Sequence, residues 1–224
     1  RAFFGTKIQT LEIPGTVTTI ESQAFEQYSS LKSVTFVDPA KSGGSTTTTI
    51  GVRAFATCEG LTTLKLTGSV SGIGQEAFLN CGMSQVIIWP GTNSVGKDAF
   101  SMCDKLTKIV IADSAAAASR AFTGCKNLDT VHYGSDTPPA EESLPDGFLP
   151  EKLHKVNIER SIGTATCTES ASIREKISCT TKGCAYSYND PQTLPALGHN
   201  LVRELTNENE KPMTSCASWT KQFK

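Results

Sequence analysis

The Ala-Phe pair is the feature that most constrains this chain, because it occurs six times within the first 122 residues. Its phenylalanines are separated by 22, 30, 23, 22 and 22 residues, at Phe3, Phe25, Phe55, Phe78, Phe100 and Phe122. Self-similarity with a period of about 20–29 residues is typical of a solenoid, in which each repeat supplies one strand and one tight turn. The period therefore predicts stacked coils whose function lies on a surface and not in a deep pocket.

A second pattern comes into register when the phenylalanines are aligned. It consists of an apolar residue, two variable residues, an apolar residue, one variable residue and a third apolar residue. The last two apolar positions alternate with polar ones, which is the period of a strand with one buried face. We therefore expect one parallel strand from each coil. The seven copies are Ile8-Leu11-Ile13, Leu31-Val34-Phe36, Leu61-Leu64-Leu66, Met83-Val86-Ile88, Leu106-Ile109-Ile111, Leu128-Val131-Tyr133 and Leu153-Val156-Ile158.

The residues around each Ala-Phe pair predict how the convex turn packs. Alanine lets the turn approach the sheet closely, and phenylalanine fills the space between turn and strand. Three residues after the phenylalanine comes a cysteine in four copies, whereas Thr6 and Tyr28 occupy this register in the earlier copies. A position that accepts Thr and Tyr is a packing position, so we expect buried free thiols that act as weak donors to loop backbone. These cysteines are Cys58, Cys81, Cys103 and Cys125.

Two places depart from the repeat. An insertion of about seven residues follows Val37 and predicts a projecting loop over residues 38–49. After Tyr133 the Ala-Phe-Cys pattern is lost, which predicts a closing coil that ends near Ile158. The chain opens with Arg1-Ala2-Phe3, which matches Arg53-Ala54-Phe55. We therefore expect it to start within a repeat of a longer protein whose upstream repeats and any export signal lie outside this sequence.

Composition and charge exclude several classes of function. The chain has 224 residues, of which 38% are hydrophobic and 19% charged, and its formal net charge is −1. Lysine and arginine are dispersed, so the basic surface of a nucleic-acid binder is not expected. No run reaches the roughly 18 apolar residues that a membrane helix needs. We expect a folded chain with no nucleic-acid partner and no membrane insertion within this segment, and the oligomeric state stays open.

A catalytic function is not predicted either. The chain has three histidines, His132, His154 and His199, and none of them lies in a recognisable catalytic motif. The Gly72-Ile73-Gly74 segment belongs to a repeat and does not have the form of a phosphate-binding loop. We therefore expect neither an enzyme nor a bound cofactor.

Two segments carry a resemblance to a known family. Leu-Glu-Ile-Pro-Gly-Thr-Val-Thr-Thr-Ile-Glu-Ser-Gln-Ala-Phe at 11–25 and Ile-Gly-Val-Arg-Ala-Phe-Ala-Thr-Cys at 50–58 resemble BspA-like leucine-rich repeats. The resemblance covers residues 1–160 and depends on the Ala-Phe-x-x-Cys segment, which differs from the asparagine ladder of other leucine-rich proteins. It implies an α/β solenoid: a right-handed leucine-rich repeat coil with a parallel concave sheet of seven short strands and short helical or 3-10 convex turns. It also implies a secreted or cell-surface protein, because members are typically exposed proteins of host-associated bacteria and some protozoan parasites. Several members are implicated in adhesion to host or matrix proteins.

The variable strand residues predict which side chains face out of the concave sheet, where stacking aligns them into columns. Ile87, Trp89 and Val110 would then lie together in water. An exposed tryptophan beside β-branched residues is the kind of anchor that protein interfaces use. In the alternative interpretation, Trp89 covers the sheet or faces a loop of the same chain. The candidate binding residues are Ile87, Trp89, Val110, Lys65, His132 and Val37.

Residues 161–224 differ in composition and predict a small, mostly β, cysteine-containing module, formed by one repeat and the start of another. The series Cys167-Thr168-Glu169, Cys179, Cys184 and Leu197-Gly198-His199 resembles a short module found after such repeats in secreted bacterial proteins, and Cys216 is the counterpart of Cys167. Three thiolates and an imidazole are the ligand types of a tetrahedral zinc site, here Cys167, Cys179, Cys184 and His199. A disulfide in an exported module is preferred over the metal, although the sequence does not define its pairing.

Two functions of different kinds agree with these features. The first is an extracellular adhesion or protein-recognition scaffold that binds a host or matrix macromolecule through the concave sheet and the loop at 38–49. The second is a structural spacer within a larger surface protein, without a ligand of its own. Binding to extracellular proteins distinguishes the two.

Overall fold

The computed structural model describes residues 7–37, 47–67, 69–111, 116–117, 120–135, 138–162 and 171–194. The chain divides into two compact units. The solenoid unit comprises residues 1–158 together with 177–187, and the second unit comprises residues 159–176 and 188–224. Within the described ranges, no helix has the length and apolar character needed to cross a membrane.

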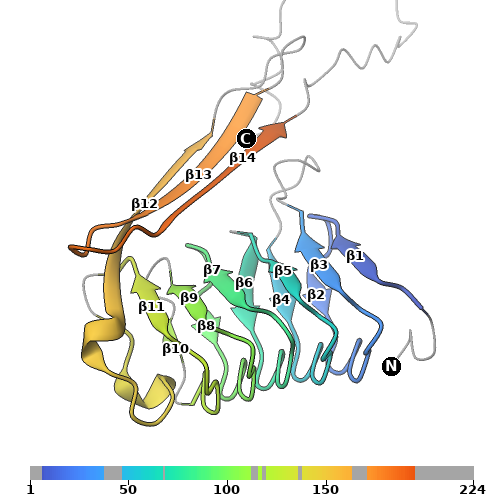
Figure 1. Ribbon diagram of the computed structural model, residues 1–224. Coiled ribbons are helices and arrows are strands. Elements are labelled where there is room, and N and C mark those ends of the chain that lie inside the picture. Colours follow the sequence, from blue (N-terminus) through green and yellow to red (C-terminus); the bar gives the residue numbers. More distant parts are fainter. Residues whose placement is uncertain are drawn as a thin grey trace, which may run out of the picture. The chain divides into compact units, whose positions relative to one another are not determined.

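The first sheet of the solenoid is built from one short parallel strand per coil (Figure 1). Neighbouring strands pair in register, so that Leu11 lies beside Val34 and Ile109 beside Val131. The inward residues of this pattern are mostly buried, as the period-two alternation predicts. The strands form two ladders: β1 (Thr10–Ile13), β3 (Ser33–Phe36) and β5 (Thr63–Lys65), then β7 (Gln85–Ile88), β9 (Lys108–Ile111) and β11 (Thr130–Tyr133), which continues into β12 (Leu153–Ile162).

A second parallel sheet lies behind the first and was not expected from the sequence. Its strands are β2 (Thr19–Ile20), β4 (Thr48–Ile50), β6 (Val70–Ile73), β8 (Ser94–Val95) and β10 (Ala116–Ala117). Each is two to four residues long, too short for an alternating pattern to stand out in the sequence. Each coil therefore contributes two strands instead of the single strand predicted.

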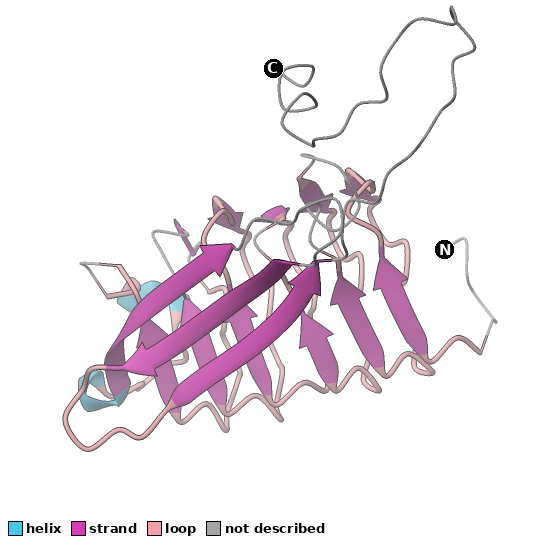
Figure 2. Ribbon diagram, turned by 90° about the horizontal axis from the view of Figure 1, so that it is seen from above, coloured by secondary structure: helices cyan, strands magenta, loops and turns pink. Residues whose placement is uncertain are grey.

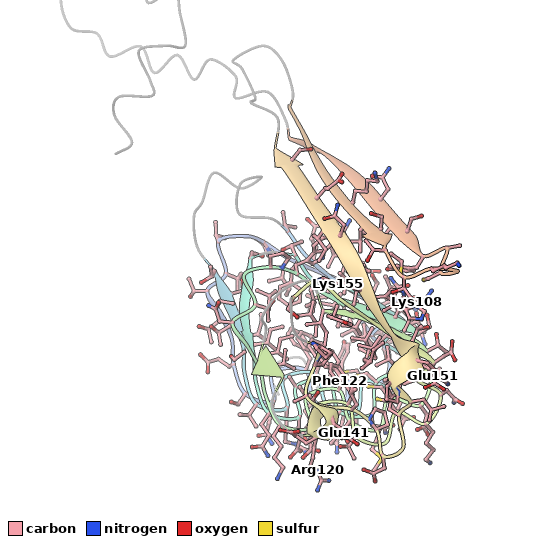
Figure 3. The ribbon with its side chains drawn as sticks, turned by 90° about the vertical axis from the view of Figure 1, so that its left-hand side faces the viewer. Lys108, Arg120, Phe122, Glu141, Glu151 and Lys155 are labelled. Atoms are coloured by element: carbon pink, nitrogen blue, oxygen red, sulfur yellow. The ribbon has the colours of Figure 1, made fainter. Side chains whose placement is uncertain are left out.

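The phenylalanines of the Ala-Phe pairs form one continuous stack through the core. Successive rings from Phe25 to Phe122 lie nearly parallel, with centroids 5.0, 5.3, 5.2 and 5.5 Å apart. Figure 3 shows Phe122 pointing into the coil, whereas Arg120 of the same turn points away from it. The alanines before the phenylalanines are fully buried at positions 54, 77, 99 and 121. The packing roles predicted for both residues are confirmed.

The four repeat cysteines form a second column beside the phenylalanines. Each thiol is buried and free, and each donates to the carbonyl of the phenylalanine in the preceding coil. The Sγ to O distances are 3.1 Å for Cys58 to Phe25, 3.2 Å for Cys81 to Phe55, 3.2 Å for Cys103 to Phe78 and 3.1 Å for Cys125 to Phe100. Burial raises the pKa of the Cys81 thiol, which keeps it protonated and unreactive. The prediction of a packing column without disulfides is confirmed.

The convex segments are tight turns that hydrogen-bond to the next coil. In one of them, the backbone N–H groups of Arg53, Phe55 and Thr57 donate to carbonyls of residues 75, 77 and 79. Arg53 and Thr57 have φ of 55° and 57°, and such left-handed pairs recur in the neighbouring turns. A Cβ added to Gly74 would lie 2.8 Å from the backbone of the preceding coil, so the coils stack too closely there for a side chain.

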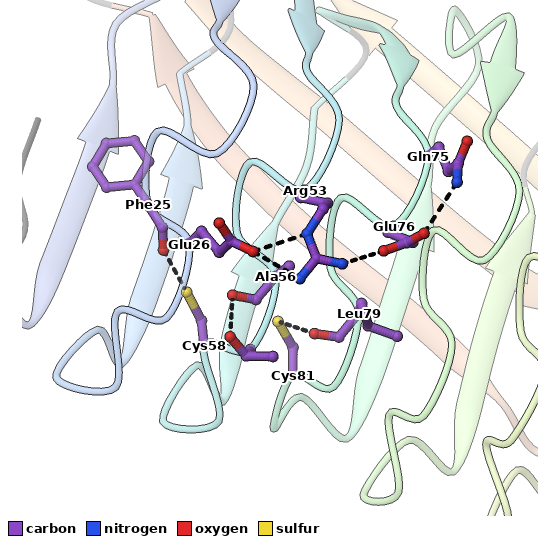
Figure 4. A network of polar contacts seen from close by, with 10 residues as sticks. Phe25, Glu26, Arg53, Ala56, Cys58, Gln75, Glu76, Leu79 and Cys81 are labelled. Carbon is purple, nitrogen blue, oxygen red and sulfur yellow. Dashed lines mark hydrogen bonds and ion pairs between the residues drawn. The ribbon is translucent and has the colours of Figure 1, made fainter. Parts of the chain in front are cut away.

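Ion pairs join successive turns on the convex side (Figure 4). Arg53 binds Glu26 of the preceding coil, with Nη2 2.7 Å from Oε1, and also pairs with Glu76 of the following coil. The hydrogen bond to Glu26 is the main cause of the raised pKa of Arg53. Both carboxylates therefore favour the charged guanidinium, which links three consecutive coils.

The closing coil replaces the Ala-Phe turn by two 3-10 turns, η2 (Glu141–Ser143) and η3 (Pro150–Lys152). These two turns are the only helical segments among the described residues. Strand β12 follows and pairs with β11 so that His132 lies beside His154. The predicted repeat pattern matched Val156 with Val131, and therefore Asn157 with His132, so it is wrong by three residues here. The register was mispredicted because the two 3-10 turns change the number of residues between β11 and β12, so the repeat spacing no longer applies.

Two further strands follow, β13 (Ala171–Cys179) and β14 (Ser187–Leu194), and the sheet order is β14-β13-β12-β11-β9-β7. Figure 2 shows the three long strands β12, β13 and β14 running in alternating directions. In the second unit, Lys176 Nζ lies 3.8 Å from Glu159 Oε2, and both side chains are more than half exposed. The segment 177–187, which includes the turn between β13 and β14, belongs to the solenoid unit.

Candidate functional site

The outward residues of β1, β3 and β5 form an accessible polar surface, which we call the open sector. Two columns of side chains cross these strands in register. None of the six side chains is buried: Thr10, Glu12 and Thr63 are exposed, and Ser33, Thr35 and Lys65 are half-buried. Hydroxyl groups and charges of both signs are therefore presented on rigid strands.

The outward residues of β7, β9 and β11 form a covered sector, where the segment 177–187 packs against the sheet. Tyr186 makes the contacts. Its hydroxyl accepts a hydrogen bond of 3.1 Å from Gln85 Nε2, Lys108 Nζ lies 4.6 Å from its ring centroid, and the His132 ring lies 4.2 Å away. Burial raises the pKa of Tyr186 to about 12. One aromatic side chain therefore touches all three strands.

The prediction that Ile87, Trp89 and Val110 lie together in water is wrong. Val110 is fully buried, and its register partners are Ile87 on β7 and His132 on β11. Trp89 is only 3% exposed. Strand β7 ends at Ile88, and the Trp89 carbonyl accepts a turn hydrogen bond of 3.2 Å from Thr92 N. The alternation of a strand therefore does not determine on which face of the sheet the Trp89 side chain lies. Its burial agrees with the alternative interpretation, in which Trp89 packs against its own chain.

The other predicted binding residues fall on both sectors. Lys65 and Val37 are half-buried and lie at the open sector. Lys65 is the last residue of β5, and Val37 directly follows β3. Ile87 is half-buried at the edge of the covered sector, and His132 is only 1% exposed. Residues 38–46 of the predicted projecting loop lie outside the described residues, and Thr48–Ile50 form strand β4.

Two histidines and two cysteines meet at the end of the covered sector. They are His132 on β11, His154 on β12, Cys179 at the end of β13 and Cys184 in the following turn. One ligand atom from each lies within 4.8 Å of the others, and His132 Nε2 is 3.5 Å from Cys184 Sγ. The two imidazole rings meet edge to face at 5.3 Å. The donor set has the composition of a metal site.

The surroundings of His132 favour its neutral imidazole. Burial, followed by the charges of His154 and Lys108, lowers the pKa of His132 from 6.5 to about 4. Burial, followed by the neighbouring Cys184, raises the pKa of the Cys179 thiol. The Nδ1 atoms of His132 and His154 are buried and have no hydrogen-bond partner in the described part of the chain.

The structure describes two of the five residues that the tail predictions name. Cys179 and Cys184 are free thiols, so neither forms the disulfide that the sequence favoured. Cys167, His199 and Cys216 lie outside the described residues. Cys179 and Cys184, which the sequence grouped with Cys167 and His199 only in the less favoured zinc alternative, lie close to His132 and His154 of the solenoid.

His154 and Tyr186 are the residues that sequence reasoning missed. His154 follows His132 by 22 residues (154 − 132), the repeat period itself, and this spacing could have placed the two rings in neighbouring coils. Tyr186 binds Gln85 across 101 residues of sequence, and no local pattern encodes such a contact.

Comparisons with solved structures found proteins that are similar to parts of this chain. Similar solved structures include a leucine rich cell surface protein from Faecalibacterium prausnitzii, 29% identical, with a TM-score of 0.45 over 72% of this chain and 45% of that one. A leucine-rich repeat protein from Bacteroides ovatus is 23% identical, with a TM-score of 0.45 over 66% and 39%, and one from T. pallidum is 19% identical, with a TM-score of 0.40 over 63% and 80%. The chain thus spans less than half the length of the first two.

The family comparison carries the assignment. No curated protein matches the chain. The description BspA type leucine rich repeat region matches residues 1–46 and 41–144, in six copies. This match includes every Ala-Phe pair and every cysteine of the packing column. The chain therefore belongs to the BspA-type leucine-rich repeat family.

Proposed function

We propose that this chain is an extracellular or cell-surface scaffold that binds a host or matrix macromolecule, most directly another protein, through the open sector. The observation that carries the proposal is the row of accessible outward side chains on β1, β3 and β5. Membership of the BspA-type family supports a protein-interaction scaffold. The location outside the cell comes from the family resemblance.

The chemistry of the open sector suits a polar protein surface. Glu12 and Lys65 provide one charge of each sign in the central column, and Thr35 lies between them in register. The adjacent column presents the hydroxyls of Thr10, Ser33 and Thr63. Hydrogen-bond donors and acceptors on a rigid sheet lose little conformational entropy on binding, so even modest contacts contribute to affinity.

The covered sector is not part of the proposed surface. Val110 and His132 are buried there, and their burial removes the apolar anchor that the sequence analysis had favoured. We therefore assign recognition to Lys65 and Val37 among the predicted residues, together with the outward residues of β1 and β3. The proposal assigns the chain no catalytic role.

The experiment is a binding screen of the immobilised chain against purified extracellular matrix and host surface proteins. For any protein that binds, Thr63→Arg should weaken binding at least about tenfold, because a long charged side chain would project from β5 across the proposed surface. Thr19→Arg is the matched control, because Thr19 is an exposed strand residue of the second sheet.

Three results would contradict the proposal. One is equal weakening by Thr63→Arg and Thr19→Arg, and another is no weakening by either. The third is the failure of the folded chain to bind any protein in the panel, which would favour the structural spacer.

A further inference from the structure

We propose that His132, His154, Cys179 and Cys184 bind one structural zinc ion, which fastens the segment 177–187 to the last strands of the solenoid. This site is independent of the proposed recognition function. It differs from the set suggested by the sequence, since it takes both imidazoles from the coils and only its two thiols from the following segment.

The geometry of the four donors is close to that of a tetrahedral site. Zinc binds histidine nitrogen at about 2.0–2.1 Å and thiolate sulfur at about 2.3 Å, so ligand atoms around one ion lie about 3.3–3.8 Å apart. His132 Nε2 and Cys184 Sγ are 3.5 Å apart, which falls in this range. The four ligand atoms all lie within 4.8 Å of one another. Side-chain rotations that move these atoms by about an ångström would bring them to tetrahedral separations.

The solenoid itself places the two histidines side by side. His132 and His154 are direct register partners on β11 and β12, one coil apart. Each has a buried Nδ1 without a hydrogen-bond partner in the described residues, although buried polar atoms are normally paired. Coordination through Nδ1 would give that atom a partner that the protein does not supply, whereas coordination of His132 through Nε2, the atom 3.5 Å from Cys184 Sγ, would leave its Nδ1 without one.

Backbone hydrogen bonds hold the two cysteines in place without a metal. Cys179 N donates to Tyr186 O at 3.0 Å, and Cys184 N donates to Thr181 O at 3.1 Å. Thr180 N donates to Lys155 O at 2.9 Å, which ties this turn to β12 next to His154. The thiols are therefore presented to the histidines by a preformed turn, and little reorganisation is needed on binding.

The donor types indicate both the metal and its role. Two thiolates and two imidazoles suit zinc, and four protein ligands leave no open position for a substrate or a reactive water, which is the mark of a structural site. Binding releases one proton from each thiol, and the two thiolate charges balance the 2+ charge of the ion. The alternative role for such a cluster is a catalytic cysteine, which would need only one histidine as its base. A second thiol and a second imidazole at the same point favour a metal site.

The first experiment measures metal in the untagged full chain purified without chelator. We expect one zinc per chain by elemental mass spectrometry. Cobalt(II) substitution should give the absorption of a tetrahedral site with thiolate-to-cobalt charge transfer. Zinc should also protect Cys179 and Cys184 from alkylation in site-resolved mass spectrometry. A chelator should lower the Tm by at least about 5 °C.

Substitutions separate this site from the set suggested by the sequence. His154→Ala and Cys184→Ser should abolish stoichiometric zinc and remove the effect of the chelator on Tm. The controls Cys167→Ser and His199→Ala replace residues of the other set, and both should retain one zinc. Far-UV circular dichroism checks that each variant is folded. The alkylation of wild type with and without zinc needs no variant, so the proposal can be tested even if a substitution prevents folding.

Several results would overturn the proposal. They are a purified chain that neither contains nor takes up zinc, a metal other than zinc at full occupancy, and a disulfide between Cys179 and Cys184. Loss of zinc in His199→Ala or Cys167→Ser together with its retention in His154→Ala would assign the metal to the other set.

Discussion

The open and covered sectors share one scaffold but differ in what lies over it. Strands of both sectors pair in parallel and in register, above the same stack of phenylalanines and beside the same column of cysteines. In the open sector no outward side chain is buried, whereas Val110 and His132 in the covered sector are almost inaccessible. The repeat therefore determines the side on which a residue lies, while a distant segment of the chain determines whether that side is available to a partner.

The largest effect tests whether the two sectors have the same scaffold. Phe55 lies under the open sector and Phe100 under the covered sector, and both rings are fully buried in the stack. The two variants are Phe55→Ala and Phe100→Ala. Each substitution should lower the free energy of unfolding by about 3–5 kcal/mol, because it leaves a cavity in the core. Urea denaturation followed by circular dichroism measures both. A difference of more than about 2 kcal/mol between the two variants would show that the scaffold is not uniform.

An intermediate effect should appear only in the covered sector. Val110→Ala should cost about 1.5–2.5 kcal/mol, because it removes two buried carbon atoms and leaves a small cavity. Thr63→Ala, at an exposed outward position of β5, should change the free energy of unfolding by less than about 0.5 kcal/mol. Equal costs in the same denaturation assay would contradict the division into sectors.

A smaller effect should come from the hydrogen bond that holds the cover in place. Tyr186→Phe removes the acceptor of the bond from Gln85 and keeps the ring against His132 and Lys108. We expect a loss of about 0.5–1.5 kcal/mol. A double-mutant cycle with Gln85→Met should show coupling of similar size, and purely additive effects would mean that the bond does not form in solution.

Most of the scaffold could be predicted from the sequence, because repetition reports the same physical requirement several times. The Phe and Cys columns are examples, since each position recurs in a fixed register. The second sheet was missed because strands such as Thr19–Ile20 are too short to show a period. The register of β12 was mispredicted because two 3-10 turns replace the Ala-Phe turn before it. For the same reason, the position of His154 beside His132 was not predicted.

The candidate site was harder to predict, because it depends on contacts between distant segments. Val110 was expected to be exposed but is fully buried, and the neighbouring Gln85, Lys108 and His132 are contacted by Tyr186, which is far along the sequence. Trp89 was misplaced because the strand ends one residue before it. Cys179 and Cys184 were recognised as metal-ligand types, but their nearest histidines belong to another part of the sequence.

Cysteine accessibility tests the division into two sectors most directly. Thr63→Cys and Val110→Cys place one thiol on the outward face of each sector, and site-resolved mass spectrometry of alkylation under native conditions separates them from the native cysteines. We predict that the thiol at position 63 reacts nearly as fast as in the unfolded chain and that the thiol at position 110 reacts at least about 100-fold more slowly, since it reacts only after local opening. Equal rates at the two positions would show that the segment 177–187 does not cover the sheet.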